Sequence, residues 1–194
     1  MNLLQDLDAD LAALAAKTQA SLVEIHNGRR GHGAGTIWHA EGLIVTNAHV
    51  VDRGSVGVVL PDGRDLPAQV LARDDECDLA ALKVDATGLQ AIELGDSRAL
   101  RAGQWVMAIG HPWGVVGAAT AGVVIGTGSA FPEGPGREAI AVSLHLRPGH
   151  SGGPLIDAEG RLVGINVMMQ GPDVGLAIPV HVAKNFLRQS LSTS

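Results

Sequence analysis

A regular succession of short apolar runs is the feature that most constrains how this chain folds. The runs lie between residues 21 and 178, and turn-forming residues separate them, for example Asn27-Gly28 and Glu41-Gly42. Short apolar runs bounded by such residues are typical of β-strands. About a dozen of them, recurring roughly every 8–12 residues, favour an all-β fold, either a sandwich or a pair of barrels.

The expected strands form two groups, joined by a connection at residues 94–103. The first group comprises 21–26, 34–39, 43–46, 56–60, 65–72 and 79–84, and the second comprises 104–109, 118–126, 139–144, 154–156, 161–168 and 174–178. Gly31, Gly33 and Gly35 precede no helical pattern, so a dinucleotide-binding loop is not expected there. We expect these glycines to turn a hairpin between the first two strands.

A helix is expected at each end of the chain. Residues 3–18 contain no Gly or Pro and carry a leucine stripe at helical spacing, at Leu4, Leu7, Leu11 and Leu14. The stripe has two interpretations: it packs on the chain's own barrel, or it joins copies of the chain. It is too short to form a stable coiled coil by itself. Residues 180–190 are the expected closing helix.

Composition argues against several classes of function. The 194 residues include 14 basic and 20 acidic ones, and aromatic residues make up only 3%. No nucleic-acid partner is expected, because phosphate binding needs clustered Lys and Arg. The single cysteine, Cys77, cannot form an internal disulfide and is expected to be a small buried residue.

The sequence also bears on location. No apolar run reaches the ~18–20 residues of a membrane span. Asp6, Asp8 and Asp10 stand where a secretion signal needs basic residues. As written, the sequence predicts a cytoplasmic protein, and an exported, periplasmic one if a leader has been trimmed.

The segment 149–154, with the sequence GHSGGP, is the most informative stretch. A serine among glycines can sit in a tight loop with its hydroxyl exposed, and the glycines allow backbone N–H groups to turn toward one point. The N–H groups of Gly149 and Ser151 are candidates for an oxyanion hole. The competing interpretation is a glycine-rich turn with an incidental serine.

A histidine and an aspartate upstream are candidates for the base that activates this serine and for the residue that orients the base. His49 ends an apolar strand, and its imidazole is the base that a weakly nucleophilic hydroxyl requires. Asp78 leads into another strand and can orient the imidazole. Taken singly, His49 is more often structural and Asp78 a solvated turn residue, but their order before Ser151 favours catalysis. His145 and His150 lack the further ligand that would complete a zinc spacing, so no metal is expected.

Together these residues resemble the chymotrypsin-like serine peptidases, and within them the HtrA (Do/Deg) family. TNAHVV at 46–51, DLAAL at 78–82 and GHSGGPL at 149–155 are similar to the family's histidine, aspartate and serine motifs. Further matches lie, in the same order, at 94–96, 101–112, 162–166 and 175–179. The resemblance covers about residues 20–190.

The resemblance implies a fold of two six-stranded antiparallel β-barrels with an extra N-terminal helix and a short C-terminal helix. The expected units are the helix 1–19, a first barrel 20–98, and a second barrel with the closing helix, 99–194. His49 would be the general base, Asp78 its partner and Ser151 the nucleophile, with Gly149 and Ser151 as the oxyanion hole. No cofactor is needed for this chemistry.

The implied function is a serine endopeptidase acting on polypeptides, including unfolded or damaged proteins, in protein quality control. Two alternatives stay open: a protease-derived binding or chaperone module with weak or no catalysis, and a hydrolase of small esters. The family commonly forms trimers, so a homotrimer joined through the N-terminal helix is a further expectation. No PDZ domain is expected within this chain.

Two positions depart from the family pattern. His150 stands where the family usually carries Asn, and Val167 stands where it usually carries a Thr beside the catalytic aspartate. The residues that correspond to the substrate pocket are His145, Leu146, Asn166, Val167, Met168, Leu176 and Ala177. None is acidic, so a medium aliphatic residue is expected before the cut, because a buried Lys or Arg would lack a partner. A protonated His145 in the pocket would instead favour an acidic residue.

Overall fold

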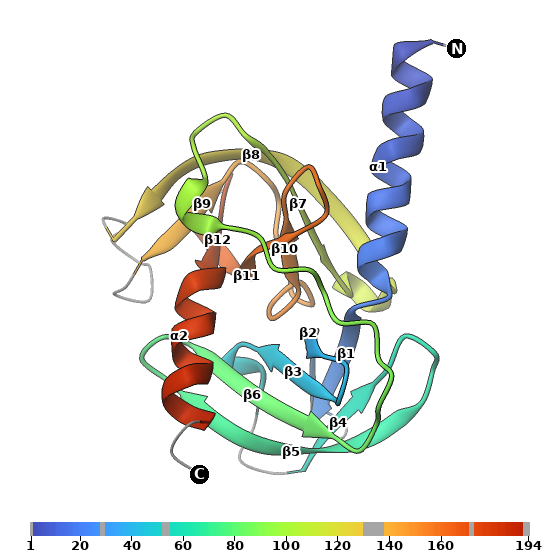
Figure 1. Cartoon of the computed structure of the whole chain (residues 1–194), viewed down its shortest axis with the longest axis vertical. Helices are drawn as coiled ribbons and strands as arrows, with labels where there is room; N and C mark the ends of the chain where they lie inside the picture. The colour runs from blue at the N-terminus through green and yellow to red at the C-terminus, as the bar shows by residue number, and fades with distance from the viewer. Residues whose placement is uncertain (1, 28–29, 52–54, 130–137, 171–172, 192–194) are drawn as a thin grey trace.

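The structure is a computed structural model that describes residues 2–27, 30–51, 55–129, 138–170 and 173–191. Its strands form two closed barrels of six strands each, and every paired strand runs antiparallel to its neighbours. Figure 1 shows the two barrels one above the other, with a helix at each end of the chain. The two-barrel fold implied by the sequence is confirmed.

The first barrel closes in the strand order β1-β2-β3-β6-β5-β4. Its strands are β1 (Leu22–Asn27), β2 (Arg30–His39), β3 (Leu43–Thr46), β4 (Val56–Val59), β5 (Asp65–Asp74) and β6 (Leu79–Val84). Alternate residues point inward because side chains on a strand face opposite sides of the sheet. Val23, Ile25, Ile37, Ile44 and Leu82 fill the interior and are fully buried.

The second barrel closes in the order β10-β11-β12-β9-β8-β7. Its strands are β7 (Trp105–Gly110), β8 (Ala118–Gly128), β9 (Ala139–Val142), β10 (Pro154–Ile156), β11 (Leu162–Gln170) and β12 (Val174–Pro179). Val106, Val124, Ile140, Val142 and Leu155 fill its interior. All twelve strands agree with the expected ones to within a few residues.

A third apolar cluster holds the barrels together. Val45 and Leu79 from the first barrel join Ile109 and Ile165 from the second, and Phe186 of α2 (Val180–Leu191) completes it. The helix α2 contacts strands of both barrels, namely β5, β6, β11 and β12. Because this cluster joins the two barrels, their docking sets how the loops of one barrel lie relative to the loops of the other.

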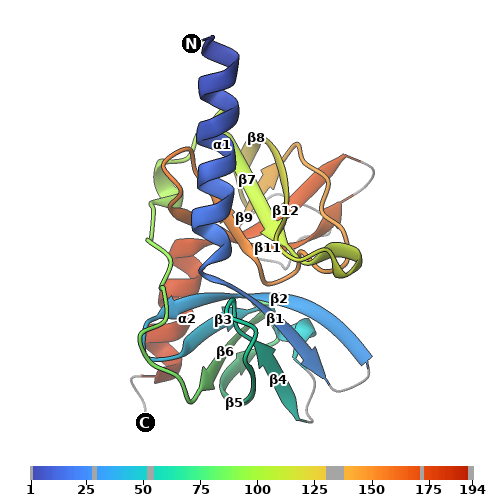
Figure 2. The same ribbon diagram turned by 90° about the vertical axis from the view of Figure 1, so that its right-hand side faces the viewer.

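The helix α1 (Leu3–Gln19) has two different halves. Leu11, Leu14 and Ala15 pack against the cluster between the barrels, and Thr18 is buried. Leu4 is 69% exposed and Leu7 is 51% exposed. Figures 1 and 2 show this outer half extending well beyond both barrels. Only the inner half of the leucine stripe therefore packs on the chain's own barrels.

The glycines near the start of the chain correct one expectation. Gly33 and Gly35 do not turn a hairpin but lie inside β2, where both are buried. A Cβ on Gly35 would lie 2.8–2.9 Å from Ile25 and Ile44 side-chain atoms. Gly35 is therefore needed for packing of the barrel interior and not for a turn.

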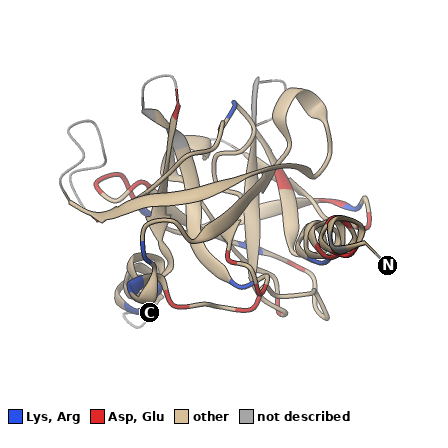
Figure 3. Ribbon diagram, turned by 90° about the horizontal axis from the view of Figure 1, so that it is seen from above, with Lys and Arg blue, Asp and Glu red and all other residues tan. Residues whose placement is uncertain are grey.

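Charged residues are spread over the surface. In Figure 3, acidic positions lie along α1 and on several loops, and Lys and Arg positions are scattered over the drawn ribbon. Within the described ranges, no helix has the length and apolar character needed to cross a membrane.

Candidate active site

Three loops supply the residues that the sequence singled out. His49 lies in the short 3-10 helix η1 (Ala48–Val50), directly after β3. Asp78 lies in the turn that enters β6, and Ser151 lies in the turn that enters β10. The first barrel thus carries His49 and Asp78, and the second carries Ser151.

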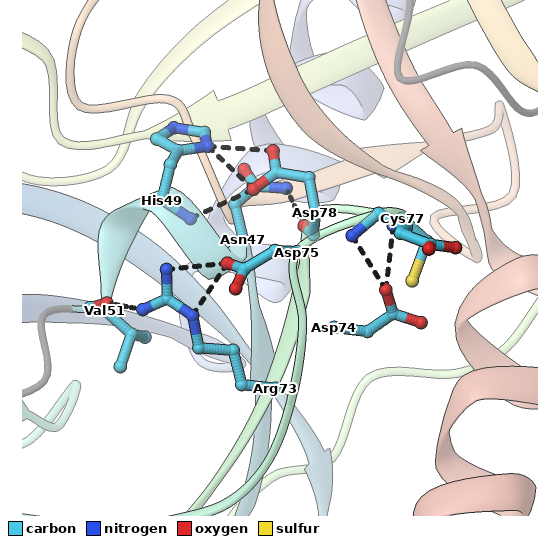
Figure 4. A network of polar contacts seen from close by, with 9 residues as sticks. Asn47, His49, Val51, Arg73, Asp74, Asp75, Cys77 and Asp78 are labelled. Atoms are coloured by element: carbon cyan, nitrogen blue, oxygen red, sulfur yellow. Dashed lines mark hydrogen bonds and ion pairs between the residues drawn. The ribbon is translucent and has the colours of Figure 1, made fainter.

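The structure brings His49 and Asp78 into direct contact. The Nδ1 atom of His49 lies 2.8 Å from Oδ2 and 3.0 Å from Oδ1 of Asp78 (Figure 4). The His49 backbone N–H also donates to Oδ1, at 3.0 Å. A carboxylate at Nδ1 keeps the ring proton there, so that Nε2 is left unprotonated in the neutral ring. The His49 side chain is 47% exposed, so this nitrogen is accessible as a base.

Asp78 is held in an unusual backbone conformation. Its φ is 52°, in the left-handed region that a residue with a Cβ adopts at a cost of about 1–3 kcal/mol. The buried Asn47 compensates by donating from Nδ2 to the Asp78 carbonyl, at 3.1 Å. Next to it, Asp74 Oδ1 accepts the Glu76 and Cys77 N–H groups at 2.9 and 3.0 Å. These contacts hold the backbone of the turn that carries Asp78.

Arg73 joins the aspartate loop to the histidine loop. Its Nε donates to Asp75 Oδ1 at 2.8 Å, and its guanidinium also donates to the Val51 carbonyl (Figure 4). Sequence reasoning missed Arg73 and Asn47. Asn47 is part of the histidine motif and could have been found there, whereas nothing in the sequence indicates that Arg73 reaches Val51.

Val167 offers no hydrogen bond to Asp78 from its side chain. The side chain is buried in the cluster between the barrels, together with Cys77 and Leu79. The described hydrogen bonds to the Asp78 carboxylate come from His49 alone, through its ring and its backbone N–H.

The hydroxyl of Ser151 is turned toward β11. Its Oγ donates to the Val167 carbonyl at 2.7 Å. Among the described hydrogen bonds, none joins this Oγ to His49. The serine proton is thus held by a backbone acceptor, and Oγ has to rotate about the Cα–Cβ bond to reach a base.

The serine loop is fastened to both barrels. The Ala34 N–H of β2 donates to the Ser151 carbonyl at 2.8 Å, and Thr36 Oγ1 donates to the Gly152 carbonyl at 3.2 Å. On the other side, Gly152 N–H donates to the Asn166 carbonyl at 2.9 Å. Gly152 has a φ of +83°, and a Cβ there would collide with the Ala34 carbonyl. The glycine is what allows the two barrels to approach at Ser151.

Two backbone N–H groups beside the serine are available for a ligand. In the part of the chain that the structure describes, the N–H groups of Gly149 and Ser151 donate to no protein acceptor. Gly149 has a φ of +105°, and its carbonyl accepts the His111 N–H at 2.8 Å. Two unpaired donors at one turn are the chemical requirement for binding an oxyanion.

The residues expected around the substrate pocket lie in different environments. Asn166 is fully buried and donates to the Pro154 carbonyl at 2.9 Å. His145 is exposed and lies 3.3 Å from Asp173. The others are buried, Leu146 and Ala177 in the second barrel, Val167 between the barrels, and Leu176 in β12. The side chain of Met168 lies outside the described residues.

The residue types that bind metal ions are not clustered in the described ranges. There, no three His, Cys, Asp or Glu residues are grouped so that they could hold a metal ion. The reactive groups that the site does contain are an imidazole, a carboxylate, a hydroxyl and backbone donors.

Comparison with known proteins identifies the family of the chain. The model of the trypsin-like peptidase domain family matches residues 33–165. A relative from Halomonas elongata, named "Probable periplasmic serine endoprotease DegP-like", is 40% identical over 167 residues, which cover 83% of this chain and 35% of the relative. A relative of the same name from Hahella chejuensis is 39% identical, covering 83% of this chain and 36% of the relative. The chain thus spans about a third of the length of these relatives.

Solved structures of HtrA-type proteases share the fold. The protease AlgW with a tripeptide superposes with a TM-score of 0.85 at 33% identity, over 92% of this chain and 62% of that one. AlgW with a decapeptide gives a TM-score of 0.85 at 28% identity, over 93% of this chain and 67% of that one. The chain therefore belongs to the trypsin-like peptidase domain family, and the solved structures named above, which share its fold, are HtrA-type proteases.

Proposed function

We propose that the chain is a serine endopeptidase that cleaves polypeptides with a His49–Asp78–Ser151 triad. The observation that carries the proposal is the contact of 2.8 Å between His49 Nδ1 and Asp78 Oδ2, in a fold shared with HtrA-type proteases. This contact leaves Nε2 of a half-exposed imidazole as the only ring atom free to take a proton. Catalysis by Ser151 requires such an oriented base, whereas a chaperone or binding module does not.

The reaction begins when Ser151 Oγ leaves the Val167 carbonyl and turns to His49. Nε2 takes the hydroxyl proton while Oγ bonds to the substrate carbonyl carbon, and the carbonyl oxygen becomes an oxyanion. The N–H groups of Gly149 and Ser151 stabilise that oxyanion. His49 then gives its proton to the leaving amine, and an acyl-enzyme forms. Water, deprotonated by His49, releases the acyl group and restores Ser151.

The substrate pocket takes a medium aliphatic residue in this proposal. The residues assigned to its wall are apolar or uncharged apart from His145, so a Lys or Arg would be desolvated without a partner. Asp173 lies 3.3 Å from His145 and offsets a positive charge on it. The contact between His145 and Asp173 therefore argues against a preference for Glu or Asp as the residue before the cut.

Digestion of denatured casein tests both parts of the proposal. Wild type should cleave it mainly after Val, Leu, Ala or Met, and Ser151→Ala should be inactive, because the variant keeps the loop and loses only the hydroxyl. Turnover by purified Ser151→Ala would refute the triad. Cuts mainly after Lys or Arg would refute the pocket assignment, and turnover of short-chain esters without casein cleavage would favour an esterase.

We infer that the chain acts outside the cytoplasm. Both DegP-like relatives quoted above are called periplasmic in their names. Of the two locations that the sequence leaves open, this favours the exported one, where unfolded polypeptides would be the substrates.

A further inference from the structure

Two buried histidines lie at the turn that leads to Ser151 and take no part in the proposed chemistry. His150 is 3% exposed and directly precedes Ser151, and His111 is 7% exposed and follows β7. The Nε2 atom of the His150 ring is buried and has no hydrogen-bond partner in the described part of the chain. A buried polar atom without a partner is costly, so this ring calls for an explanation.

His150 closes the turn that contains Gly149. Its backbone N–H donates to the Arg147 carbonyl at 2.9 Å, and its Nδ1 accepts the Arg147 N–H at 3.0 Å. Nδ1 also lies 3.2 Å from the Arg147 carbonyl. An unprotonated Nδ1 thus accepts from the Arg147 amide, whereas a protonated Nδ1 can only donate to the carbonyl and leaves that amide without an acceptor.

His111 holds the same turn from the other side. Its backbone N–H donates to the Gly149 carbonyl at 2.8 Å, and its Nδ1 accepts the Gly117 N–H at 3.3 Å. A Cβ on Gly149 would lie 2.5 Å from the His111 carbonyl. The Gly149 peptide is therefore confined between the two histidine segments, and its N–H direction depends on both.

The surroundings of both rings favour the neutral form. Burial lowers the pKa of His150, and nearby Arg147 and His111 lower it further, while a hydrogen bond to the Arg147 carbonyl opposes the shift. Burial also lowers the pKa of His111, while the negative charge of Glu24 and a hydrogen bond to the Val23 carbonyl of β1 oppose this shift. The charged or titratable groups that act on His150 are thus Arg147 and His111, and neither supplies negative charge.

We propose that His150 is a positioning residue that holds Gly149 in the oxyanion-binding conformation while its ring is neutral, and that protonation at acidic pH releases the turn. The inference rests on the proposed function of the same site. In a released turn each ring regains its ordinary pKa of 6.5. The closed turn binds protons less well than the released turn. The free energy that favours the closed turn is therefore fully present above pH 6.5 and is lost as the pH falls through the lowered pKa values of the closed turn.

Two substitutions of His150 separate positioning from simple packing. His150→Asn keeps an acceptor where Nδ1 lies and cannot titrate, whereas His150→Gln carries its amide toward the place of Nε2, which has no partner. At pH 8 we expect kcat of His150→Asn within about threefold of wild type. We expect kcat of His150→Gln to fall about 10²-fold with a smaller change in KM, the loss typical of one oxyanion donor.

The pH profile and a direct readout complete the test. Below neutral pH, kcat of wild type should fall more steeply than kcat of His150→Asn. In wild type, protonation of either His49 or His150 lowers kcat, whereas in the variant only His49 remains to be protonated.

In the full chain with Ser151→Ala, the pH dependence of the NMR chemical shift of the Gly149 amide should follow the protonation of the His150 ring. In Ser151→Ala/His150→Asn this pH dependence should be lost. Equal kcat losses in the Asn and Gln variants, or a Gly149 amide insensitive to His150, would overturn the inference. Absent wild-type turnover would refute the proposed function, while the Gly149 titration would still decide the role of His150.

Discussion

At the scale of single residues, the site depends on the hydrogen bond from His49 Nδ1 to the Asp78 carboxylate, which orients the imidazole. His49 Nδ1 points at the Asp78 carboxylate, and Asn47 and Arg73 hold the loops that make this contact. The sequence predicts His49 and Asp78 because a histidine motif and an aspartate motif occur in the right order. It does not predict the Arg73 contact, because a link between two loops leaves no local pattern.

Asp78→Asn tests this direction. An amide can present its NH₂ group to Nδ1, which then becomes an acceptor and moves the ring proton to Nε2, where the base is needed. We expect kcat for casein peptides to fall about 10⁴-fold, as in related triads, with the fold unchanged. Kinetics and circular dichroism on Asp78→Asn measure this, and a loss below about tenfold would show that Asp78 does not orient His49.

At the scale of elements, the strands were predictable because each is a short apolar run between turn residues. The misplaced glycines show the limit of that reasoning. Gly33 and Gly35 look like turn residues in the sequence, but neighbouring side chains in the barrel decide their place. Likewise, the leucine pattern of α1 predicts a helix, but not that its outer half projects from the barrels.

The turn at Gly152 provides a prediction with a matched control. Gly63 has nearly the same φ, +87° against +83°, but a Cβ on Gly63 would meet nothing within 4 Å. Gly63→Ala should lower the free energy of unfolding by about 1–2 kcal/mol, the cost of the left-handed conformation. Gly152→Ala should cost clearly more, because its Cβ also collides with the Ala34 carbonyl. Equal losses in urea unfolding would show that the serine turn tolerates the extra atom.

The outer half of α1 is the proposed contact between copies in a homotrimer. Leu4 and Leu7 are exposed there, whereas Leu14 packs against the cluster between the barrels. Replacing both Leu4 and Leu7 by Glu should convert a trimer to a monomer without lowering the free energy of unfolding of the barrels. Light scattering checks this, with Leu14→Ala as the variant that weakens packing within one chain. A monomeric wild type would refute the homotrimer.

At the scale of the whole molecule, the site exists only where two barrels meet. The Ser151 and Gly152 carbonyls accept from Ala34 and Thr36 of the first barrel, so the loop of the nucleophile is attached to the barrel that carries the base. The order of the motifs in the sequence predicts this assembly. The direction of the Ser151 hydroxyl, toward the Val167 carbonyl, could not be predicted, because it depends on a rotation within the assembled site.

Labelling with a fluorophosphonate tests the central claim most directly, because only a serine activated by its base reacts readily. The chain of 194 residues would be treated at pH 8, digested with a second protease and mapped by mass spectrometry. The account predicts one modified residue, Ser151, in wild type, and at least about 10³-fold slower labelling in His49→Ala. An unlabelled wild type, or labelling at the same rate in His49→Ala, would contradict the assignment of His49, Asp78 and Ser151 as a catalytic triad.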